Sequence, residues 1–356
     1  MDRGGLVLGI ETSCDETSAA VVAEGRRVLS SLVSSQVALH EKYRGVVPEI
    51  AARAHVEQLV PLIEQALREA GVGYGELEAV AVTGGPGLVG ALLIGVTAAR
   101  TLAVTRALPL VAVDHVEAHA TSAALGADPP PWPAVALVVS GGHTALYLVR
   151  GPLDVELLGQ TVDDAAGEAF DKVAALLELG YPGGPHIERL ARDGRPDAIR
   201  FPRTWIGEPH ADFSFSGLKT AVLYHVHGVG NKYGSLGHLS PSERADVAAS
   251  FQAALVDVLV AKTIAAAQRL GVGNIVIGGG VAVNGALRGA LAAACAAAGV
   301  GLHLTPPQYC TDNAAMIAAQ GYHLLRAGRC ADLSLEPWAG LRRTGRESQA
   351  AGMRTR

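Results

Sequence analysis

Alternating apolar and polar stretches divide the chain into two parts that repeat one pattern. Residues 6–22 form an apolar run, a turn rich in Thr, Ser, Asp and Glu, and a second apolar run, and residues 135–149 repeat this plan with Ser-Gly-Gly-His-Thr in the turn. This pattern is typical of two strands joined by a tight turn. Either turn taken alone is equally typical of an ordinary hairpin, but two of them predict duplicated halves whose turns face a shared cleft.

Helical spacing of apolar residues predicts the elements between and after the hairpins. Apolar residues recur every three or four positions from Val56 to Leu67, and short apolar runs at 80–83, 108–113 and 275–277 indicate strands. Glycine-rich loops follow the first and third of these strands. The predicted helices lie within residues 40–71, 84–104, 163–177, 187–191, 243–270, 281–288 and 314–326.

Consecutive prolines at 129–133 indicate the boundary between two domains, because they hold an extended backbone that joins neither a helix nor a sheet. We therefore predict an N-terminal domain at 1–128, a C-terminal domain at 129–330 and a flexible tail at 331–356. The most apolar region, 88–104, is interrupted by glycine, threonine and arginine, which favours a buried helix over a membrane span. The start of the chain lacks the layout of a signal peptide.

Composition and charge restrict the partners. The 356 residues are 49% hydrophobic and 18% charged, as in well-packed proteins with a sizeable core. The four cysteines show neither metal-site nor disulfide spacing, which favours a reducing, cytoplasmic location. The net charge of -5 implies that any grip on nucleic acid is local. Two basic clusters are candidates, with solvated surface charge as the alternative for each: Arg192, Arg195, Arg200, Arg203 and Lys219, and in the tail Arg342, Arg343, Arg346, Arg354 and Arg356.

The segment after the strand at 108–113 carries the clearest candidate chemistry. His115 and His119 are four residues apart, so on a helix both imidazoles lie on one face and can bind one metal ion. Glu117 points to another face, unlike the glutamate of the HExxH motif in zinc proteases, which argues against a metallopeptidase. The alternative is a solvated helix start capped by Asp114.

Two such halves, joined by crossing helices after Gly84 and after Asp312, resemble the actin, Hsp70 and sugar-kinase superfamily. The expected fold is therefore α/β, with two duplicated RNase H-like domains and a nucleotide cleft between them. Between about residue 9 and residue 320 the chain also resembles the tRNA N6-adenosine threonylcarbamoyltransferase family in bacterial form. The motifs that carry this resemblance are ETSCDET, GVVPEIAARAH, GGPGL, HVEAH, SGGHT, DDAAGEAFDK, YPGGP, FSFSGLKTA, GGGVAVN and CTDNAAMIA.

The resemblance implies a site. It assigns one divalent metal, Fe²⁺ with Zn²⁺ as the alternative, to His115, His119 and Asp312; two imidazoles and a carboxylate suit such a metal. It implies threonylcarbamoyl-AMP as substrate, with ATP or ADP able to occupy the same cleft. The substrate-binding positions that it implies are Val138, Val139, Ser140, Gly141, Gly142, Asp171, Gly184 and Asn284. The general base stays open among Glu11, Asp15, Glu16 and Asp171.

The reaction that the resemblance implies is transfer of the threonylcarbamoyl group to N6 of the adenosine 3′ of the anticodon, in tRNAs that read codons beginning with adenine, with release of AMP. It also implies tRNA, an inert paralogous subunit, a small P-loop ATPase and a separate threonylcarbamoyl-AMP synthase as partners. Because the chain is acidic, we expect weak tRNA binding when it is alone. The rival is an ATP-binding chaperone-like or regulatory module of the same superfamily, which would need no metal.

Overall fold

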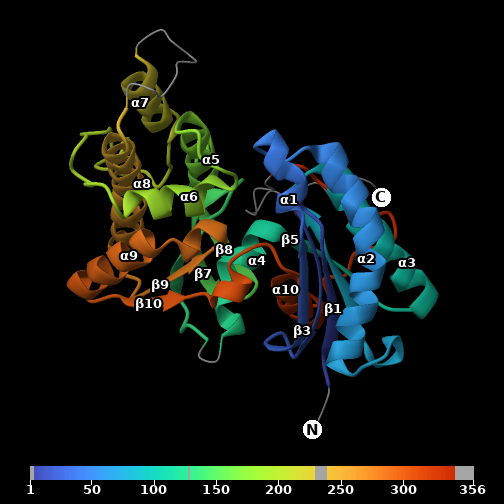
Figure 1. Cartoon of the computed structure of the whole chain (residues 1–356). Helices are drawn as coiled ribbons and strands as arrows, with labels where there is room; N and C mark the ends of the chain where they lie inside the picture. The colour runs from blue at the N-terminus through green and yellow to red at the C-terminus, as the bar shows by residue number, and fades with distance from the viewer. Residues whose placement is uncertain (1–3, 127–128, 229–238, 341–356) are drawn as a thin grey trace, which may run out of the picture.

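The computed structural model describes residues 4–126, 129–228 and 239–340. It consists of two α/β halves that lie side by side, each built on a five-stranded sheet (Figure 1). Each sheet is covered by helices on both faces. The central strand of each sheet is therefore buried along its whole length, without the alternation of a half-exposed strand, and is apolar except for Glu11.

The first sheet has the strand order β3-β2-β1-β4-β5. Neighbours β1, β2 and β3 run antiparallel, whereas β4 and β5 are parallel to β1. This explains why a hairpin was recognisable at residues 6–22. The strands are β1 (Leu6–Glu11), β2 (Glu16–Ala23), β3 (Arg27–Ser35), β4 (Ala79–Gly85) and β5 (Leu110–Asp114).

The second sheet repeats this connectivity, with the order β10-β9-β6-β7-β8. Here β6, β7 and β8 form the antiparallel part, and β9 and β10 are parallel to β6. The prediction of duplicated halves is thus confirmed. The strands are β6 (Ala134–Val139), β7 (Thr144–Gly151), β8 (Asp154–Gln160), β9 (Asn274–Gly278) and β10 (Gly301–Leu304).

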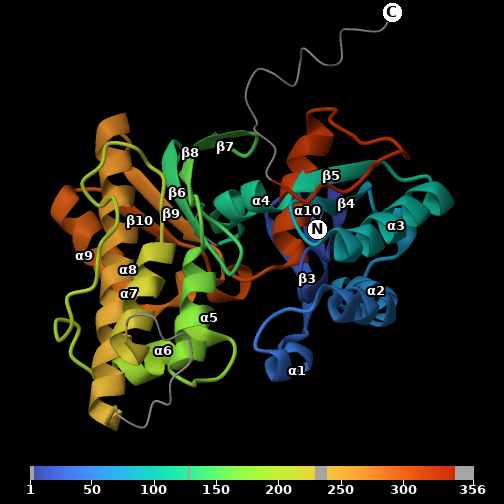
Figure 2. The same ribbon diagram turned by 90° about the horizontal axis from the view of Figure 1, so that it is seen from above.

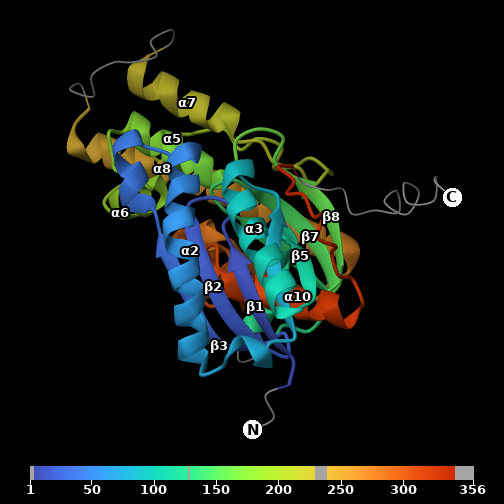
Figure 3. The same ribbon diagram turned by 90° about the vertical axis from the view of Figure 1, so that its right-hand side faces the viewer.

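Helices α2 and α3 cover one face of the first sheet, and α10 covers the other (Figures 2 and 3). The larger core of the second half lies between its sheet and helices α5 to α9. The helix bounds are α1 (Val37–His40), α2 (Pro48–Ala70), α3 (Val89–Arg106), α4 (His115–Thr121), α5 (Ala166–Leu176), α6 (Gly183–Ala191), α7 (Ser216–His227), α8 (Pro241–Leu270), α9 (Gly285–Ala298) and α10 (Ala314–Arg326).

Two helices cross between the halves. Helix α4 follows β5 of the first sheet but packs its apolar side on β6 and β7 of the second. Helix α10 follows the second half in the chain but packs on β1, β2 and β4 of the first. The helix after Gly84 is α3, and our expectation that it crosses is wrong, because Val96 and Ala99 face the core of the first half. The domain bounds drawn at 128 and 330 stay a prediction.

The segment 331–340 lies against the first half. The Ala331 N–H donates to the carbonyl of Leu110 at 2.8 Å, and the Trp338 N–H donates to the carbonyl of Gly84 at 2.9 Å. The Trp338 ring lies on Gly84 and Gly85, where a Cβ atom would collide with it. The tail that we expect to be flexible therefore begins with a packed segment, and residues 341–356 lie outside the described part of the chain.

Two helices, α3 and α8, are long and apolar enough to cross a membrane by length and composition alone. In α8, 72% of the most apolar stretch is buried inside the second half. Helix α3 packs on α2 and on the first sheet. Helix α8 is therefore a core helix, whereas α3, with 33% of its most apolar stretch buried, packs one side on the first half and leaves the other exposed.

Candidate metal and nucleotide site

Helix α4 places two histidines between the halves. The Asp114 carboxylate at the end of β5 accepts hydrogen bonds from the N–H groups of Val116 and Glu117, at 2.9 and 3.1 Å, and so begins the helix. His115 and His119 then lie on one helix face with their ring centroids 4.7 Å apart. The expected cap is present, but the helix start is not solvated, because these side chains are only 3% and 1% exposed.

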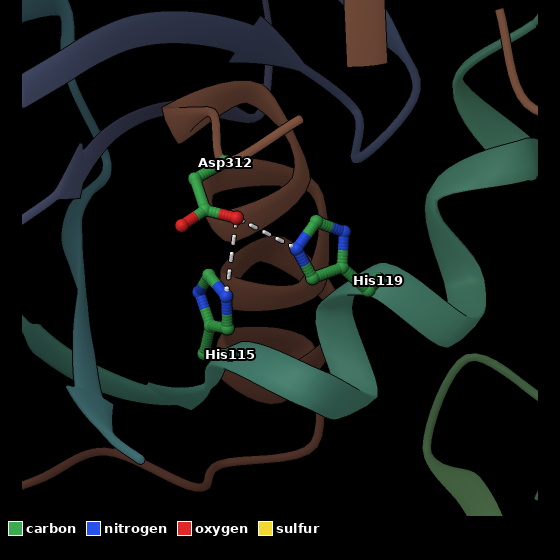
Figure 4. Close-up of side chains that lie close together, drawn as sticks. All are labelled: His115, His119 and Asp312. Atoms are coloured by element: carbon green, nitrogen blue, oxygen red, sulfur yellow. Dashed lines mark hydrogen bonds and ion pairs between the residues drawn. The ribbon is translucent and has the colours of Figure 1, made fainter. Parts of the chain in front are cut away.

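The loop before α10 brings Asp312 to both rings (Figure 4). One carboxylate oxygen, Oδ1, lies 3.1 Å from Nε2 of His119 and 3.4 Å from Nε2 of His115. The loop is held by the Ala314 N–H, which donates to the Ser18 hydroxyl at 2.8 Å. Within the described residues, the three side chains form a cluster whose potential ligand atoms all lie within 4.8 Å of one another. The predicted metal ligands are thus brought together.

Glu11 fixes the orientation of His115 from the side away from Asp312. Its Oε2 lies 2.9 Å from Nδ1 of His115 and accepts a hydrogen bond from the Thr83 hydroxyl at 2.6 Å. The Ser13 N–H donates to the other oxygen of Glu11. With the imidazole proton held at Nδ1, the Nε2 lone pair of His115 faces Asp312. Carboxylate–histidine pairs of this kind orient the ligand in metal sites.

The charges of the cluster fit a divalent cation. Burial favours the neutral ring of His115, but the carboxylates of Asp312 and Glu11 outweigh it and raise its pKa well above the ordinary value. The pKa of His119 is lowered, mainly by burial. Without an ion, a proton on His115 offsets part of the charge of the buried Glu11 and the partly buried Asp312. With both imidazoles neutral, two negative charges remain, and uncompensated buried charge is costly. A divalent ion at the meeting point of the two Nε2 atoms and Oδ1 would neutralise them.

A cavity of about 650 Å³ opens beside this cluster, with walls from both halves. Four of the predicted site residues are not among the described residues that line it: Glu11, His119, Val138 and Val139. Val138 and Val139 are fully buried in β6. Val138 pairs with β7 and β9, and Val139 pairs with β7, so both residues support the turn that follows. The predicted residues that line the cavity are Asp15, Glu16, His115, Ser140, Gly141, Gly142, Asp171, Gly184, Asn284 and Asp312.

The glycines of the cavity wall differ in what surrounds them. A Cβ atom on Gly141, Gly142 or Gly184 would meet no protein atom within 4 Å, so these positions border the open cavity. In contrast, a Cβ on Gly183 would lie 2.6 Å from the carbonyl oxygen of Phe170. Gly183 is therefore required for helix packing, whereas the other three leave room for a ligand close to the backbone.

Asn284 is largely occupied by the protein itself. Its side-chain oxygen caps α9 by accepting from the Leu287 N–H at 3.0 Å, and its NH₂ group donates to Gln252 at 2.9 Å and to Glu188 at 3.4 Å. Our sequence reasoning missed Glu188, which lines the cavity. Its position four residues after Gly184 on one helix was the available signal.

The candidate bases have different surroundings. Burial raises the pKa of Glu16 to about 8, although the Ser35 hydroxyl donates to it at 2.9 Å. Burial also raises the pKa of Asp171 to about 6 against the opposing hydrogen bond from the Gly183 N–H, and it raises the pKa of Asp15. Glu11 does not reach the cavity. His143, also missed, lines the cavity, and burial beside His115 lowers its pKa to about 4.

Two RNase H-like halves around a cleft that holds two histidines and an aspartate define a protein of the actin and sugar-kinase fold class with a candidate metal centre. The model of the tRNA N6-adenosine threonylcarbamoyltransferase family matches residues 27–319. A relative of that name from Symbiobacterium thermophilum is 55% identical over 337 residues, which cover 95% of this chain and 96% of the relative. One from Anaeromyxobacter dehalogenans is 53% identical, covering 93% and 98%. The chain belongs to this family of tRNA-modifying transferases.

Solved structures agree on the fold. HypF from T. kodakarensis superposes with a TM-score of 0.60 at 16% identity, covering 93% of this chain and 49% of HypF. The activator of the 2-hydroxyisocaproyl-CoA dehydratase from Clostridium difficile, solved with bound ADPNP, gives a TM-score of 0.52 at 13% identity, covering 91% and 97%. At such identities the likeness concerns the fold alone, which confirms the expected fold class.

Replacement of Glu11 by Gln tests its role as the holder of His115. The amide keeps the volume of the side chain but removes the charge that fixes the Nδ1 proton. We expect metal affinity, measured by competition with a chelator, to fall about 10- to 100-fold while the fold is retained. Glu57→Gln, on the exposed side of α2, is the control and should bind normally. Unchanged affinity in Glu11→Gln would contradict the role.

Replacement of Gly184 by Ala separates ligand contact from packing. Ala has a higher helix propensity than Gly. The free energy of unfolding of the variant should therefore equal that of the unsubstituted chain or exceed it by up to about 1 kcal/mol. Its affinity for threonylcarbamoyl-AMP should fall at least tenfold, or about 1.4 kcal/mol, since the methyl group projects into the cavity. Gly289→Ala in α9 also meets no protein atom and lies outside the cavity, so it should gain stability without losing affinity. Equal affinities of the two variants argue against ligand contact at Gly184.

Proposed function

We propose that this chain transfers the threonylcarbamoyl group from threonylcarbamoyl-AMP to N6 of the tRNA adenosine 3′ of the anticodon and releases AMP. The observation that carries the proposal is the meeting of Asp312 with His115 and His119 beside a glycine-lined cavity. Family membership supplies the reaction class, and the cavity supplies a place where an adenylate and a metal would be neighbours.

The residues of the chain have separable tasks in this proposal. His115, His119 and Asp312 would hold the divalent metal, most favourably Fe²⁺, with Zn²⁺ as the alternative. When bound, such a metal supplies a Lewis acid that polarises a substrate oxygen. Gly141, Gly142 and Gly184 are open to the cavity and would let the adenylate approach the backbone. ATP or ADP would fit the same place.

Nucleophilic attack by N6 requires a group that accepts its proton. Glu11 is enclosed by its own hydrogen bonds, and a Glu16 carboxyl with a pKa of about 8 is mostly protonated near neutral pH. Asp15 and Asp171 are the remaining members of the predicted set, and both line the cavity. We therefore assign the proton acceptor to this pair.

Neither rival explains the site as well. A zinc peptidase would need Glu117 as its base, but Glu117 is not among the cavity residues within the described chain. An ATP-binding module without transfer chemistry would explain the cavity, but it would not explain the cluster of His115, His119 and Asp312. Metal analysis of the purified chain separates this module from the transferase.

The partner subunits and the cytoplasmic location are part of the proposal. We infer that the inert paralogue docks on an apolar face of α2 and α3, since four aliphatic side chains there are 48–60% exposed. The two helices adjoin, because a Cβ atom on Gly90 would lie 3.7 Å from the Cβ of Ala52. The small P-loop ATPase and the synthase are expected from the family alone. The exposed side chains are Val56, Val60, Val89 and Leu93.

The transfer reaction is tested directly with labelled threonylcarbamoyl-AMP, unmodified tRNA and the chain together with its partner subunits. We expect label in tRNA and release of AMP. The double variant His115→Ala/His119→Ala should lose bound metal and about two orders of magnitude or more in transfer rate. His303→Ala, a histidine of β10 outside the cavity, is the matched control. Normal transfer by a metal-free double variant would end the metal part of the proposal.

The docking face is tested by charge insertion. Val60→Asp/Leu93→Asp should weaken binding of the paralogous subunit at least tenfold, because two carboxylates would be buried in an apolar contact, at a cost of about 1.4 kcal/mol or more. Val162→Asp places one such carboxylate on the second half at a position that is 61% exposed, and should leave binding unchanged. Calorimetric titration of the paralogue measures both, and equal affinities would rule out this face.

A further inference from the structure

The loop between β4 and α3 forms part of the cavity wall, and the proposed function gives it no task. Pro86, Gly87 and Leu88 line the cavity. The Leu88 N–H donates to the carbonyl of Ser13 at 2.8 Å. A Cβ atom on Gly87 would lie 2.6 Å from that same oxygen, so the backbone of the loop packs directly on the turn that follows β1. Ser13 thus holds the end of the loop.

The C-terminal segment holds the beginning of the same loop. The Trp338 N–H donates to the Gly84 carbonyl at 2.9 Å. A Cβ atom on Gly85 would lie 2.8 Å from Cγ and from Cδ1 of the indole, and one on Gly84 would collide with the six-membered part of the ring. Only glycine allows such a close approach. The indole therefore covers the backbone where β4 ends.

Contacts outside the cavity determine where Trp338 lies. The segment that follows α10 returns to β5 (Figure 2), where the Ala331 N–H donates to the Leu110 carbonyl at 2.8 Å. Ala331 and Leu335 pack on the apolar core of the first half. Between them, the Asp332 carboxylate accepts a hydrogen bond from the Ser334 N–H at 2.7 Å, which closes a turn. The first half itself thus anchors the segment, without a contribution from any ligand.

The C-terminal segment and the loop together form an apolar part of the cavity wall. Ala339 lines the cavity with Pro86 and Leu88, whereas five carboxylates are among the other described lining residues. An adenylate anion gains free energy where its uncharged parts meet apolar groups, and it loses free energy beside carboxylates. The position of this apolar part therefore affects how tightly the ligand binds.

Gly84 and Gly85 have no side chains that could fill the space of the indole. Removal of the ring would uncover the beginning of the loop and let the backbone at 86–88 take several positions. A ligand would then have to order that backbone when it binds. Ordering the backbone of one residue costs enough free energy to lower affinity by about tenfold.

We propose that Trp338 is a positioning residue for threonylcarbamoyl-AMP: it holds the beginning of the loop while Ser13 holds its end, so the ligand meets a wall that is already in place. The identity of the ligand rests on the proposed function. Trp338 is not among the described residues that line the cavity, so its effect passes through residues 84–88. The metal ligands are held separately, because Glu11 and Thr83 belong to paired strands and are hydrogen-bonded to each other at 2.6 Å.

The experiment compares the full chain with Trp338→Ala, Trp338→Phe and the matched control Tyr322→Ala. The Tyr322 ring also covers two glycines of the first half, Gly5 and Gly25, but it lies outside the cavity. In calorimetric titration with threonylcarbamoyl-AMP, Trp338→Ala should bind about tenfold more weakly or worse. Trp338→Phe keeps a ring on the glycines, so it and Tyr322→Ala should bind within about threefold of the unsubstituted chain.

Three outcomes of the binding experiment would overturn the proposal. One is unchanged affinity in Trp338→Ala, and another is binding by Trp338→Phe that is as weak as by Trp338→Ala. The third is an equal loss in Tyr322→Ala at a similar drop in the free energy of unfolding, because the loss would then follow from stability alone. Metal affinity, measured by competition with a chelator, should stay within about threefold in Trp338→Ala. Its loss would contradict a role confined to the cavity wall.

Transfer assays distinguish failure of this inference from failure of the proposed function. With partner subunits present, Trp338→Ala should raise KM for threonylcarbamoyl-AMP about tenfold and leave kcat nearly unchanged, since the loop contributes to binding and not to the chemical step. A lower kcat at unchanged KM would overturn the positioning role. Absence of threonylcarbamoyl-AMP binding and transfer in the unsubstituted chain contradicts the proposed function. Transfer with the same KM in both chains contradicts only the role of Trp338.

Discussion

Asp312 meets His115 and His119 where the two halves join, and the architecture of the cleft depends on this contact. A second carboxylate, that of Glu11, is buried on the far side of His115. Buried charges of one sign cost several kcal/mol each unless a partner compensates them. A cation held by His115, His119 and Asp312 would provide that compensation, so the electrostatics of the buried cluster make the site suitable for a metal.

Duplication of the RNase H-like unit explains why both halves contribute to one cavity. The turn after β1 and the turn after β6 occupy equivalent places in the two sheets, and both line the cavity. Their chemistry differs: the first turn supplies Asp15 and Glu16, whereas the second supplies Ser140 and two open glycines. Of these two turns, the first thus brings acidic groups, and the second brings a surface that a nucleotide phosphate can approach.

Several residues of the predicted site act on other residues and do not face the cavity. Glu11 orients His115, and Val138 and Val139 form the strand that carries the Ser140 turn. The side chain of Asn284 forms hydrogen bonds with the start of α9, with Gln252 and with Glu188. The positions of the motifs do not reveal this division of tasks. The geometry of the site depends equally on residues that support it and on residues that contact the ligand.

The amino-acid sequence alone was sufficient for the elements that depend on local pattern. It predicted both hairpins, the glycine loops, the histidine pair on one helix face and the Asp114 cap, because the spacing of neighbouring residues determines each of these. The order of its motifs was also sufficient for the family. Tertiary structure decided which helices cross, which glycines are open and that Trp338 holds the C-terminal segment against Gly84. His119 and Asp312 are 193 residues apart in the chain, and only the packing of α10 on the first sheet sets the distance between them.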